Sequence, residues 1–466
     1  MNLLIRSVVV GCVVFVSATS GFAKLRLPAV FADHMVLQQL DTVRVWGWAK
    51  AEQAVQIVVP WLASPLETRS NNQGSWELEI PTCEAGGPYE LLISTELDTI
   101  ILQDVLLGEV WLCSGQSNMV WGASFGHEEM LNELPNAYRP MIRLFHVARN
   151  QAEVPLDTLQ GSWQVCDSAT AHSFSAIGYF AAKTLNEKLG VPIGIINSSS
   201  GGTNVETWTP AQVFEAEPAL ALLTNHALPV ATHWNAMIRP LVGFKIKGVF
   251  WYQGEGNVIS YQGYGKLLEN MVRAWREAWG YVFPFFQVQI APYAYSSQQV
   301  LGNKAAFLRE QQLHTLTTIP QTGLVITTDL VPDVNEIHPP KKRDIANRLS
   351  DLALAEVYGH RMIDYKSPIY AGHRVERNHM VIAFDNVIHG LRVMGDRVSH
   401  MFIAGNNHVF YPAETTVRGN ELIVSSPHVP VPVAVRFGFT DTARPNLFNC
   451  SGLPVSPFRT DKWDIP

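Results

Sequence analysis

The feature that most constrains the fold is a series of short apolar runs that alternate with segments of helical periodicity between residues 106 and 360. Consecutive apolar residues are typical of strands buried on both faces of a parallel sheet. They occur at 110–113, 142–145, 193–196, 247–251, 285–288 and 323–326. Helical spacing of apolar residues follows at 175–189, 264–279 and 344–358. This order predicts a three-layer α/β domain with a mainly parallel sheet, which binds ligands at the carboxyl ends of its strands.

Short alternating runs flank this region on both sides. Turn residues separate them at a spacing of about ten residues, which indicates a β-sandwich. On the N-terminal side the runs lie at 43–48, 54–59, 76–80 and 89–93, and on the C-terminal side at 379–384, 401–403, 421–424 and 433–437. We therefore expect an N-terminal β-sandwich domain over 24–105, an α/β domain over 106–360 and a C-terminal β-rich region over 361–466.

The first 23 residues have the pattern of a secretory signal peptide. Arg6 precedes an apolar run from Val8 to Val16, and small residues lead to Ala23. The run is shorter than the roughly 20 apolar residues that span a bilayer. We expect cleavage near Lys24 and a secreted or periplasmic protein without membrane attachment, with an uncleaved anchor as the alternative.

The composition limits the partners of the chain. Its formal net charge is −7 and only 16% of the 466 residues are charged, whereas a nucleic-acid-binding protein needs a basic face. No nucleic-acid partner is expected. The 13 tryptophans suit a protein that packs sugar rings on indole faces, although most tryptophans of any chain belong to its core. The oligomeric state is left open.

The cysteines predict neither a metal site nor a disulfide scaffold. Cys12 lies in the expected signal peptide, and the spacing of the other four matches no metal-binding pattern: Cys83, Cys113, Cys166 and Cys450. One disulfide in an oxidising compartment and buried free thiols both remain open, with Cys113 expected to be a free thiol.

Ser117 is the residue whose position most strongly suggests chemistry. It lies in Gly-Gln-Ser-Asn-Met at 115–119, directly after an apolar run. At such a strand end, backbone N–H groups can stabilise a developing oxyanion. A serine needs a base to become a nucleophile near neutral pH, and His338 in Ile-His-Pro at 337–339 can be that base. The pair predicts acyl transfer through a serine ester.

Two further segments also follow apolar runs. Small residues at 197–203 allow close approach of the backbone, and the segment at 251–257 carries amides that can donate to an oxyanion. The polar segment 333–338 surrounds His338. Each segment alone is an ordinary turn, but their joint occurrence after successive predicted strands indicates one site at the edge of the sheet.

These motifs together resemble the sialate O-acetylesterases of the SGNH-hydrolase superfamily. The resemblance rests on Gly-Gln-Ser-Asn-Met, on Gly-Gly-Thr at 201–203 with Glu-Thr-Trp at 206–208, on Trp-Tyr-Gln-Gly-Glu-Gly-Asn at 251–257, and on Ile-His-Pro. Segments at 31–38, 233–238 and 452–461 extend it over the mature chain. It implies an SGNH-type, flavodoxin-like hydrolase domain flanked by β-sandwich-like regions.

The resemblance also implies roles for individual residues. Ser117 becomes the nucleophile and His338 the general base. The implied oxyanion donors are the Ser117 N–H, Gly201 or Gly202, and Gln253, with Asn257 as a second candidate for the role of Gln253. A turn-stabilising amide is the alternative for Asn257, and Glu255 is expected to orient its loop through hydrogen bonds.

The third catalytic residue departs from the family pattern. Many relatives have aspartate three residues before the histidine, but this chain has Asn335, which cannot supply a charge. The candidates that remain are Asp333, Glu336 and Asp329. A backbone carbonyl could instead hold the imidazole and leave a Ser-His dyad.

The implied function is removal of O-acetyl groups from carbohydrate, with sialic acids as the first-choice substrate and an acetyl-serine intermediate. No metal or cofactor is expected, because the histidines show no metal-ligand spacing. Two alternatives stay open: an acetylxylan or other polysaccharide O-deacetylase, and a non-catalytic glycan-binding protein. A sialate carboxylate would require a nearby arginine, for which the candidates are Arg143, Arg239 and Arg309.

Overall fold

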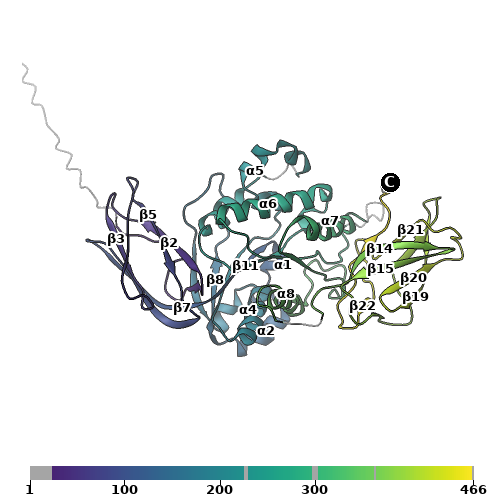
Figure 1. The fold of residues 1–466 in the computed structure, drawn as a ribbon, viewed down its shortest axis with the longest axis horizontal. Helices are drawn as coiled ribbons and strands as arrows, with labels where there is room; N and C mark the ends of the chain where they lie inside the picture. Colours follow the sequence, from purple (N-terminus) through teal and green to yellow (C-terminus); the bar gives the residue numbers. More distant parts are fainter. Residues whose placement is uncertain (1–23, 225–228, 296–302, 361–363, 464–466) are drawn as a thin grey trace, which may run out of the picture.

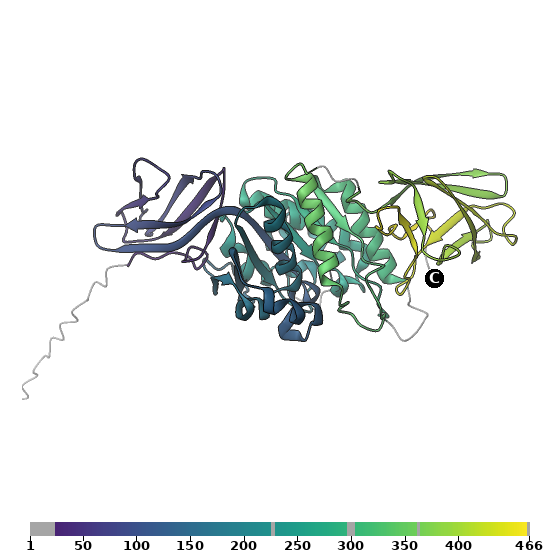
Figure 2. The same cartoon turned by 90° about the horizontal axis from the view of Figure 1, so that it is seen from below.

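The computed structural model describes residues 24–224, 229–295, 303–360 and 364–463. An N-terminal β unit, a central α/β unit and a C-terminal β unit lie in a row (Figures 1 and 2). The expected signal peptide over 1–23 lies outside the described residues. In the described ranges, no helix is both long enough and apolar enough to cross a membrane.

The central unit is built on a twisted sheet with the strand order β13-β12-β11-β7-β10-β8-β9. Neighbouring strands are parallel except for the antiparallel pair β8–β9. The strands are β7 (Thr99–Gly115), β8 (Arg139–Val147), β9 (Gly161–Cys166), β10 (Ile193–Ser199), β11 (Gly248–Tyr252), β12 (Phe285–Val288) and β13 (Thr322–Val325). All six predicted apolar runs overlap these strands, which confirms the α/β class.

Helices cover both faces of this sheet (Figure 1). The helices α4 (Ala176–Leu189) and α8 (Lys342–Glu356) share one core with the sheet, and α6 (Tyr264–Trp279) packs into the core on the other face beside α7 (Lys304–Thr318). The sequence did not predict α7, because its buried face includes the polar residues Arg309, Gln312 and Thr315. The short helices are α1 (Ser117–Val120), α2 (Glu128–Glu133), α3 (Ser168–His172) and α5 (Ala211–Ala216).

The N-terminal β unit is continuous with the central sheet through β7. Residues 99–107 of β7 pair with β6, and residues 109–115 pair with β10, so the expected boundary near residue 105 falls inside one strand. The other strands of this unit are β1 (Val36–Gln38), β2 (Thr42–Trp48), β3 (Ala54–Val58), β4 (Leu66–Arg69), β5 (Ser75–Pro81) and β6 (Gly86–Ser94). The strand that presents Ser117 therefore also belongs to this unit.

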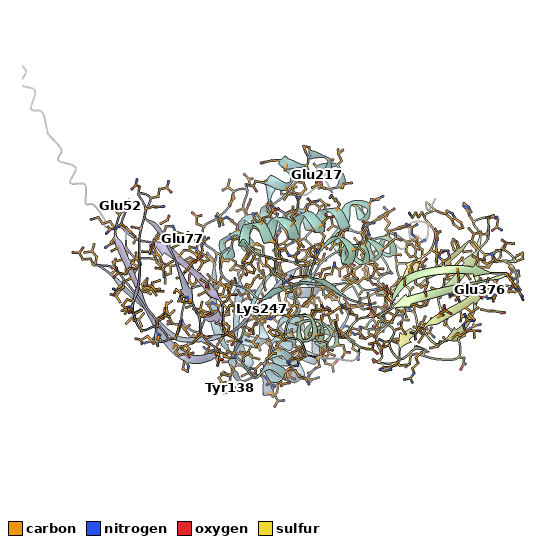
Figure 3. The ribbon with its side chains drawn as sticks, in the orientation of Figure 1. Glu52, Glu77, Tyr138, Glu217, Lys247 and Glu376 are labelled. Carbon is orange, nitrogen blue, oxygen red and sulfur yellow. The ribbon has the colours of Figure 1, made fainter. Side chains whose placement is uncertain are left out.

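The C-terminal β unit has its own core of aliphatic and aromatic side chains. Its strands are β14 (Ile369–Glu376), β15 (His379–Asp385), β16 (Leu391–Val393), β17 (Met401–Ala404), β18 (Phe410–Pro412), β19 (Glu414–Arg418), β20 (Glu421–Ser425), β21 (Ala434–Phe437), β22 (Leu447–Asn449) and β23 (Phe458–Arg459). Arg459 forms a bidentate ion pair with Glu310 of α7, which joins this unit to the central one. Glu52 and Glu376, labelled in Figure 3, lie in the two outer units.

Candidate active site

Ser117 lies at the switch point of the central sheet. Strand β7 stands between β10 and β11, so the chain builds the sheet outward from β7 in both directions. In open α/β sheets, the crevice at such a point and at the carboxyl ends of the strands holds the ligand. Because β7 ends at Gly115 and α1 begins at Ser117, this partly exposed side chain stands at that crevice.

Gly115 makes the sharp turn between β7 and α1. Its φ is 128°, and a Cβ atom there would lie 2.2 Å from the carbonyl oxygen of Tyr252. The Gln116 N–H donates to that same carbonyl at 2.9 Å, and the Gly115 carbonyl accepts from the Ser200 N–H at 3.0 Å. The turn that presents Ser117 is thus held between the ends of β10 and β11, and only glycine fits it.

We expect Gly115→Ala to lower the free energy of unfolding by about 3 kcal/mol or more, because it combines positive φ with a backbone clash. Thermal and urea denaturation measure the change. Gly190→Ala is the matched control, since Gly190 also has positive φ but open space around it, and about 1 kcal/mol is expected there. Equal losses in the two variants would contradict the close approach at Gly115.

Backbone amides form a cradle next to Ser117. Gly201 and Gly202 are exposed after β10, and a Cβ on Gly201 would lie 3.5 Å from the Ser117 Cβ. No acceptor among the described residues lies within hydrogen-bonding distance of the N–H groups of Ser117, Gly201 and Gly202. These three N–H groups therefore have no internal acceptor among the described residues, and their role as oxyanion donors stays a prediction.

Gln253 and Asn257 do not occupy the position expected of oxyanion donors. Both are fully buried. The Gln253 Nε2 lies within 2.8–3.2 Å of acceptors on Gln116, Thr203 and Asn257, and the Asn257 Nδ2 donates to Glu206 at 2.7 Å. These amides brace the loop that carries Gly201 and Gly202, because their N–H groups have internal partners. The turn-stabilising alternative for Asn257 agrees with this geometry.

His338 lies against the helix that begins with Ser117. Its ring stacks on Trp121, the residue directly after α1, with a centroid separation of 4.0 Å and an interplanar angle of 18°. Asn118 Nδ2 also donates to the carbonyl of Ile337 at 3.1 Å. The Ser117 hydroxyl has no hydrogen-bond partner among the described residues. The segments of Ser117 and His338 therefore meet through the Trp121 and Asn118 contacts.

Glu336 is the carboxylate that lies beside the imidazole. Its Oε1 is 3.4 Å from Nδ1 of His338 and accepts the His338 backbone N–H at 2.8 Å. The Glu336 side chain is 51% exposed. Glu336 can therefore orient the ring, although water competes for the same carboxylate.

The other two acid candidates have other partners. Asp333 accepts hydrogen bonds from the backbone and side-chain N–H groups of Asn335 at 2.9 and 3.0 Å. Asp329 forms a bidentate ion pair with Arg348, at 2.9 and 2.6 Å. The expectation that Asp333 contacts the histidine is thus not met, because its carboxylate closes a local turn instead.

The surroundings of His338 lower the pKa of its imidazole below the ordinary value of 6.5. Burial is the largest cause, the Lys342 ammonium adds to it, and Glu336 acts in the opposite direction. The neutral imidazole therefore predominates near pH 7. This is the form that can accept a proton.

The three arginines suggested by the sequence do not reach this site as free cations. Arg143 is buried in a bidentate pair with Asp104, and Arg309 donates to backbone carbonyls of the C-terminal unit. Arg239 lines a separate cavity with Trp46 of the N-terminal unit. Burial and internal partners, which the sequence does not show, account for Arg143 and Arg309, whereas Arg239 is exposed at its own cavity.

Arg149 is a cation near the site that sequence analysis missed. It follows β8, is exposed, and its guanidinium lies 5.8 Å from the ring centroid of Phe125. Phe125 stacks on Trp121 with ring centroids 5.5 Å apart, and Trp121 in turn stacks on His338. An aromatic row therefore runs from the candidate base to an exposed guanidinium.

Among the described residues, no group of three or more histidine, cysteine, aspartate or glutamate side chains could hold a metal ion. The four cysteines after residue 23 are all free thiols. Cys113 and Cys166 are buried, and burial raises the pKa of the Cys166 thiol to about 12.

Known proteins match both the sequence and the fold. The carbohydrate esterase family described as sialic acid-specific acetylesterases matches residues 107–354. Sialate O-acetylesterase of Rattus norvegicus is 28% identical over 413 residues, which cover 74% of this chain and 76% of that protein. The Homo sapiens enzyme of the same name is 28% identical over 402 residues, which cover 76% of this chain and 74% of that protein. A carbohydrate acetylesterase from Xanthomonas citri has a TM-score of 0.87 and 34% identity, covering 94% of this chain and 100% of its own.

The family match and the similarity to a carbohydrate acetylesterase define a carboxylic ester hydrolase. The family match spans more than half of the 466 residues. The chain belongs to the sialic acid-specific acetylesterase family of carbohydrate esterases and is an O-deacetylase of carbohydrates. Of the functions left open by the sequence, this membership favours the hydrolases over the non-catalytic glycan-binding protein.

Proposed function

We propose that this enzyme removes acetyl groups from O-acetylated sialic acids, with Ser117 as nucleophile and His338 as general base. The observation that supports the proposal is that the loop of His338 packs on the segment that begins with Ser117. Ser117 stands beside free backbone N–H groups, and the His338 ring lies on Trp121, one helical turn further along the same chain segment. Glu336 is the proposed acceptor at the second ring nitrogen.

The proposed reaction uses these groups in sequence. His338 accepts the Ser117 proton as the hydroxyl oxygen attacks the acetyl carbonyl. The N–H groups of Ser117, Gly201 and Gly202 stabilise the oxyanion. The imidazolium then gives its proton to the sugar oxygen that leaves, and water hydrolyses the acetyl-serine by the same route.

The sialate substrate is supported by the names of the animal relatives and by Arg149. A sialic acid differs from a neutral sugar by its carboxylate, which pairs well with a guanidinium. Arg149 is exposed, and no carboxylate among the described residues pairs with it. Its position at the end of the Trp121–Phe125 row suits a ligand that also contacts Ser117.

We expect Arg149→Gln to lower kcat/KM for O-acetylated sialic acids by about 10- to 100-fold, because a charge-assisted hydrogen bond is lost. Hydrolysis of p-nitrophenyl acetate, which carries no carboxylate, should change less than about twofold. Initial rates on both esters measure the effect. Arg239→Gln, at the separate cavity, is the matched control and should leave both rates unchanged.

The second candidate is a polysaccharide O-deacetylase, including acetylxylan. It is favoured by the 34% identity to a solved bacterial structure described as a carbohydrate acetylesterase. Faster hydrolysis of acetylated xylan than of acetylated sialic acids, with no effect of Arg149→Gln on either, would replace the sialate proposal by this one.

A further inference from the structure

A buried lysine lies directly behind the candidate catalytic pair. Lys342 is the first residue of α8 and has no exposed surface. Its Nζ donates a hydrogen bond to Oδ1 of Asn118 and lies 5.4 Å from the centroid of the Tyr252 ring. The lysine thus contacts Asn118, the residue that follows Ser117, and approaches Tyr252 at the end of β11.

Asn118 connects this lysine to both other segments of the site. Its Nδ2 donates to Oε1 of Glu255 at 2.6 Å and to the carbonyl of Ile337 at 3.1 Å. Asn118 is adjacent to Ser117 in the chain, and Ile337 is adjacent to His338. One buried amide therefore ties the serine helix, the histidine loop and the 251–257 segment together.

Stability of the fold does not explain this arrangement. An ammonium group and a carboxylate lose much hydration free energy in a protein interior, and apolar residues of similar volume are often as stable or more stable. Burial lowers the pKa of Lys342 to about 7 and raises the pKa of Glu255. Two buried ionisable groups that contact Asn118, the residue after Ser117, point to a role in the reaction.

We propose that Lys342 is a positioning residue of the esterase, which acts through Asn118 and Glu255 to hold the His338 loop against the helix of Ser117. This inference rests on the proposed roles of Ser117 and His338. The three residues Lys342, Asn118 and Glu255 are called the clamp below.

The clamp also places a positive charge close to the imidazole. The titratable groups that act on Lys342, or on which it acts, come from three segments: Glu255, Glu336, His338, Glu129 and His127. The ammonium lowers the pKa of His338, whereas Glu336 raises it. Removal of the ammonium therefore raises that pKa, and the acid limb of the pH–rate profile moves to higher pH.

The test compares Lys342→Met with Lys341→Met in the full chain, using p-nitrophenyl acetate. Lys341 is the exposed neighbour at the start of the same helix. We expect Lys342→Met to lower kcat by about 10- to 100-fold, because small displacements of a catalytic group have effects of this size. KM should stay within about twofold, and the acid limb of kcat/KM should move to higher pH. Lys341→Met should match the wild type.

A second variant, Asn118→Leu, separates loss of the proposed positioning role from loss of folding. Methionine has a similar volume, but removal of the ammonium leaves the buried Glu255 without its cation, so Lys342→Met should be less stable than the wild type and is assayed at a temperature where it is folded. Asn118→Leu removes the donor and acceptor of the same clamp, and its loss of kcat should be similar. The double variant should be no slower than either single one, because both act through one unit. Melting curves check that each variant is folded.

Wild-type kcat in folded Lys342→Met, an unmoved acid limb, or additive losses in the double variant would overturn the role of the clamp. Ser117→Ala, measured alongside, separates this result from failure of the proposed function. If Ser117→Ala is inactive while Lys342→Met equals the wild type, only the clamp is wrong. If Ser117→Ala keeps wild-type activity, the catalytic assignment itself is wrong.

Discussion

Replacing Ser117 by alanine is expected to lower kcat/KM for p-nitrophenyl acetate by about 10⁴-fold or more, since the acetyl-serine can no longer form. The melting temperature should remain close to that of the wild type, because the Ser117 hydroxyl has no hydrogen-bond partner in the described part of the chain. Steady-state rates and thermal denaturation measure the two quantities. Trapping of an acetylated peptide by mass spectrometry should succeed for the wild type and fail for the variant.

Ser173→Ala is the control for this change. Ser173 is an exposed serine at the end of α3, with only a weak local hydrogen bond to the Thr170 carbonyl at 3.4 Å. The activity and melting temperature of the Ser173→Ala variant should equal those of the wild type. An unaffected Ser117→Ala rate, with Ser173→Ala as reference, would rule out the serine-ester mechanism.

Replacing His338 by alanine is expected to lower kcat/KM by about 10³- to 10⁴-fold, because the proposed acceptor of the serine proton is removed. In the wild type, kcat/KM should fall as the pH drops through the pKa of the imidazole. That pKa is lowered by burial and by Lys342, so the fall should occur below pH 6.5. A pH–rate profile of kcat/KM from pH 4 to pH 9 provides the measurement.

The same assay distinguishes the two acid candidates. Glu336→Gln should lower kcat/KM only about fivefold, because an ion pair exposed to water contributes at most about 1 kcal/mol. Asp333→Asn should have no effect, since its carboxylate closes a turn with Asn335. A larger loss in Asp333→Asn than in Glu336→Gln would reverse this assignment.

The sheet was predictable because its strands are apolar on consecutive positions. Such runs indicate strands that are buried on both faces, and all six of them overlap observed strands. Helix α7 was not predictable in this way, because the polar side chains Arg309 and Gln312 are buried and bond to internal carbonyls. Periodicity detects a helix only where its buried face is apolar.

The site was predictable to the level of segments. Ser117, Gly201 and Gly202 lie together, as strand ends of a parallel sheet must, and His338 lies against the Ser117 helix. The roles of Gln253 and Asn257 were not predictable, since an amide that braces a loop has the same sequence pattern as one that faces a substrate. Their burial and their partners distinguish the two roles.

The amino-acid sequence by itself determined the α/β class, the serine at the end of a buried strand and the histidine far along the chain. These three features depend on local patterns of polarity and on the backbone freedom of glycine. Both properties belong to a single chain segment and need no contact with distant residues. Only the tertiary structure decided that Glu336 rather than Asp333 lies beside the imidazole, that Arg149 is exposed beside Phe125, and that Lys342 is buried against Asn118. Such choices depend on which side chains, distant in sequence, compete for the same partner once water is excluded.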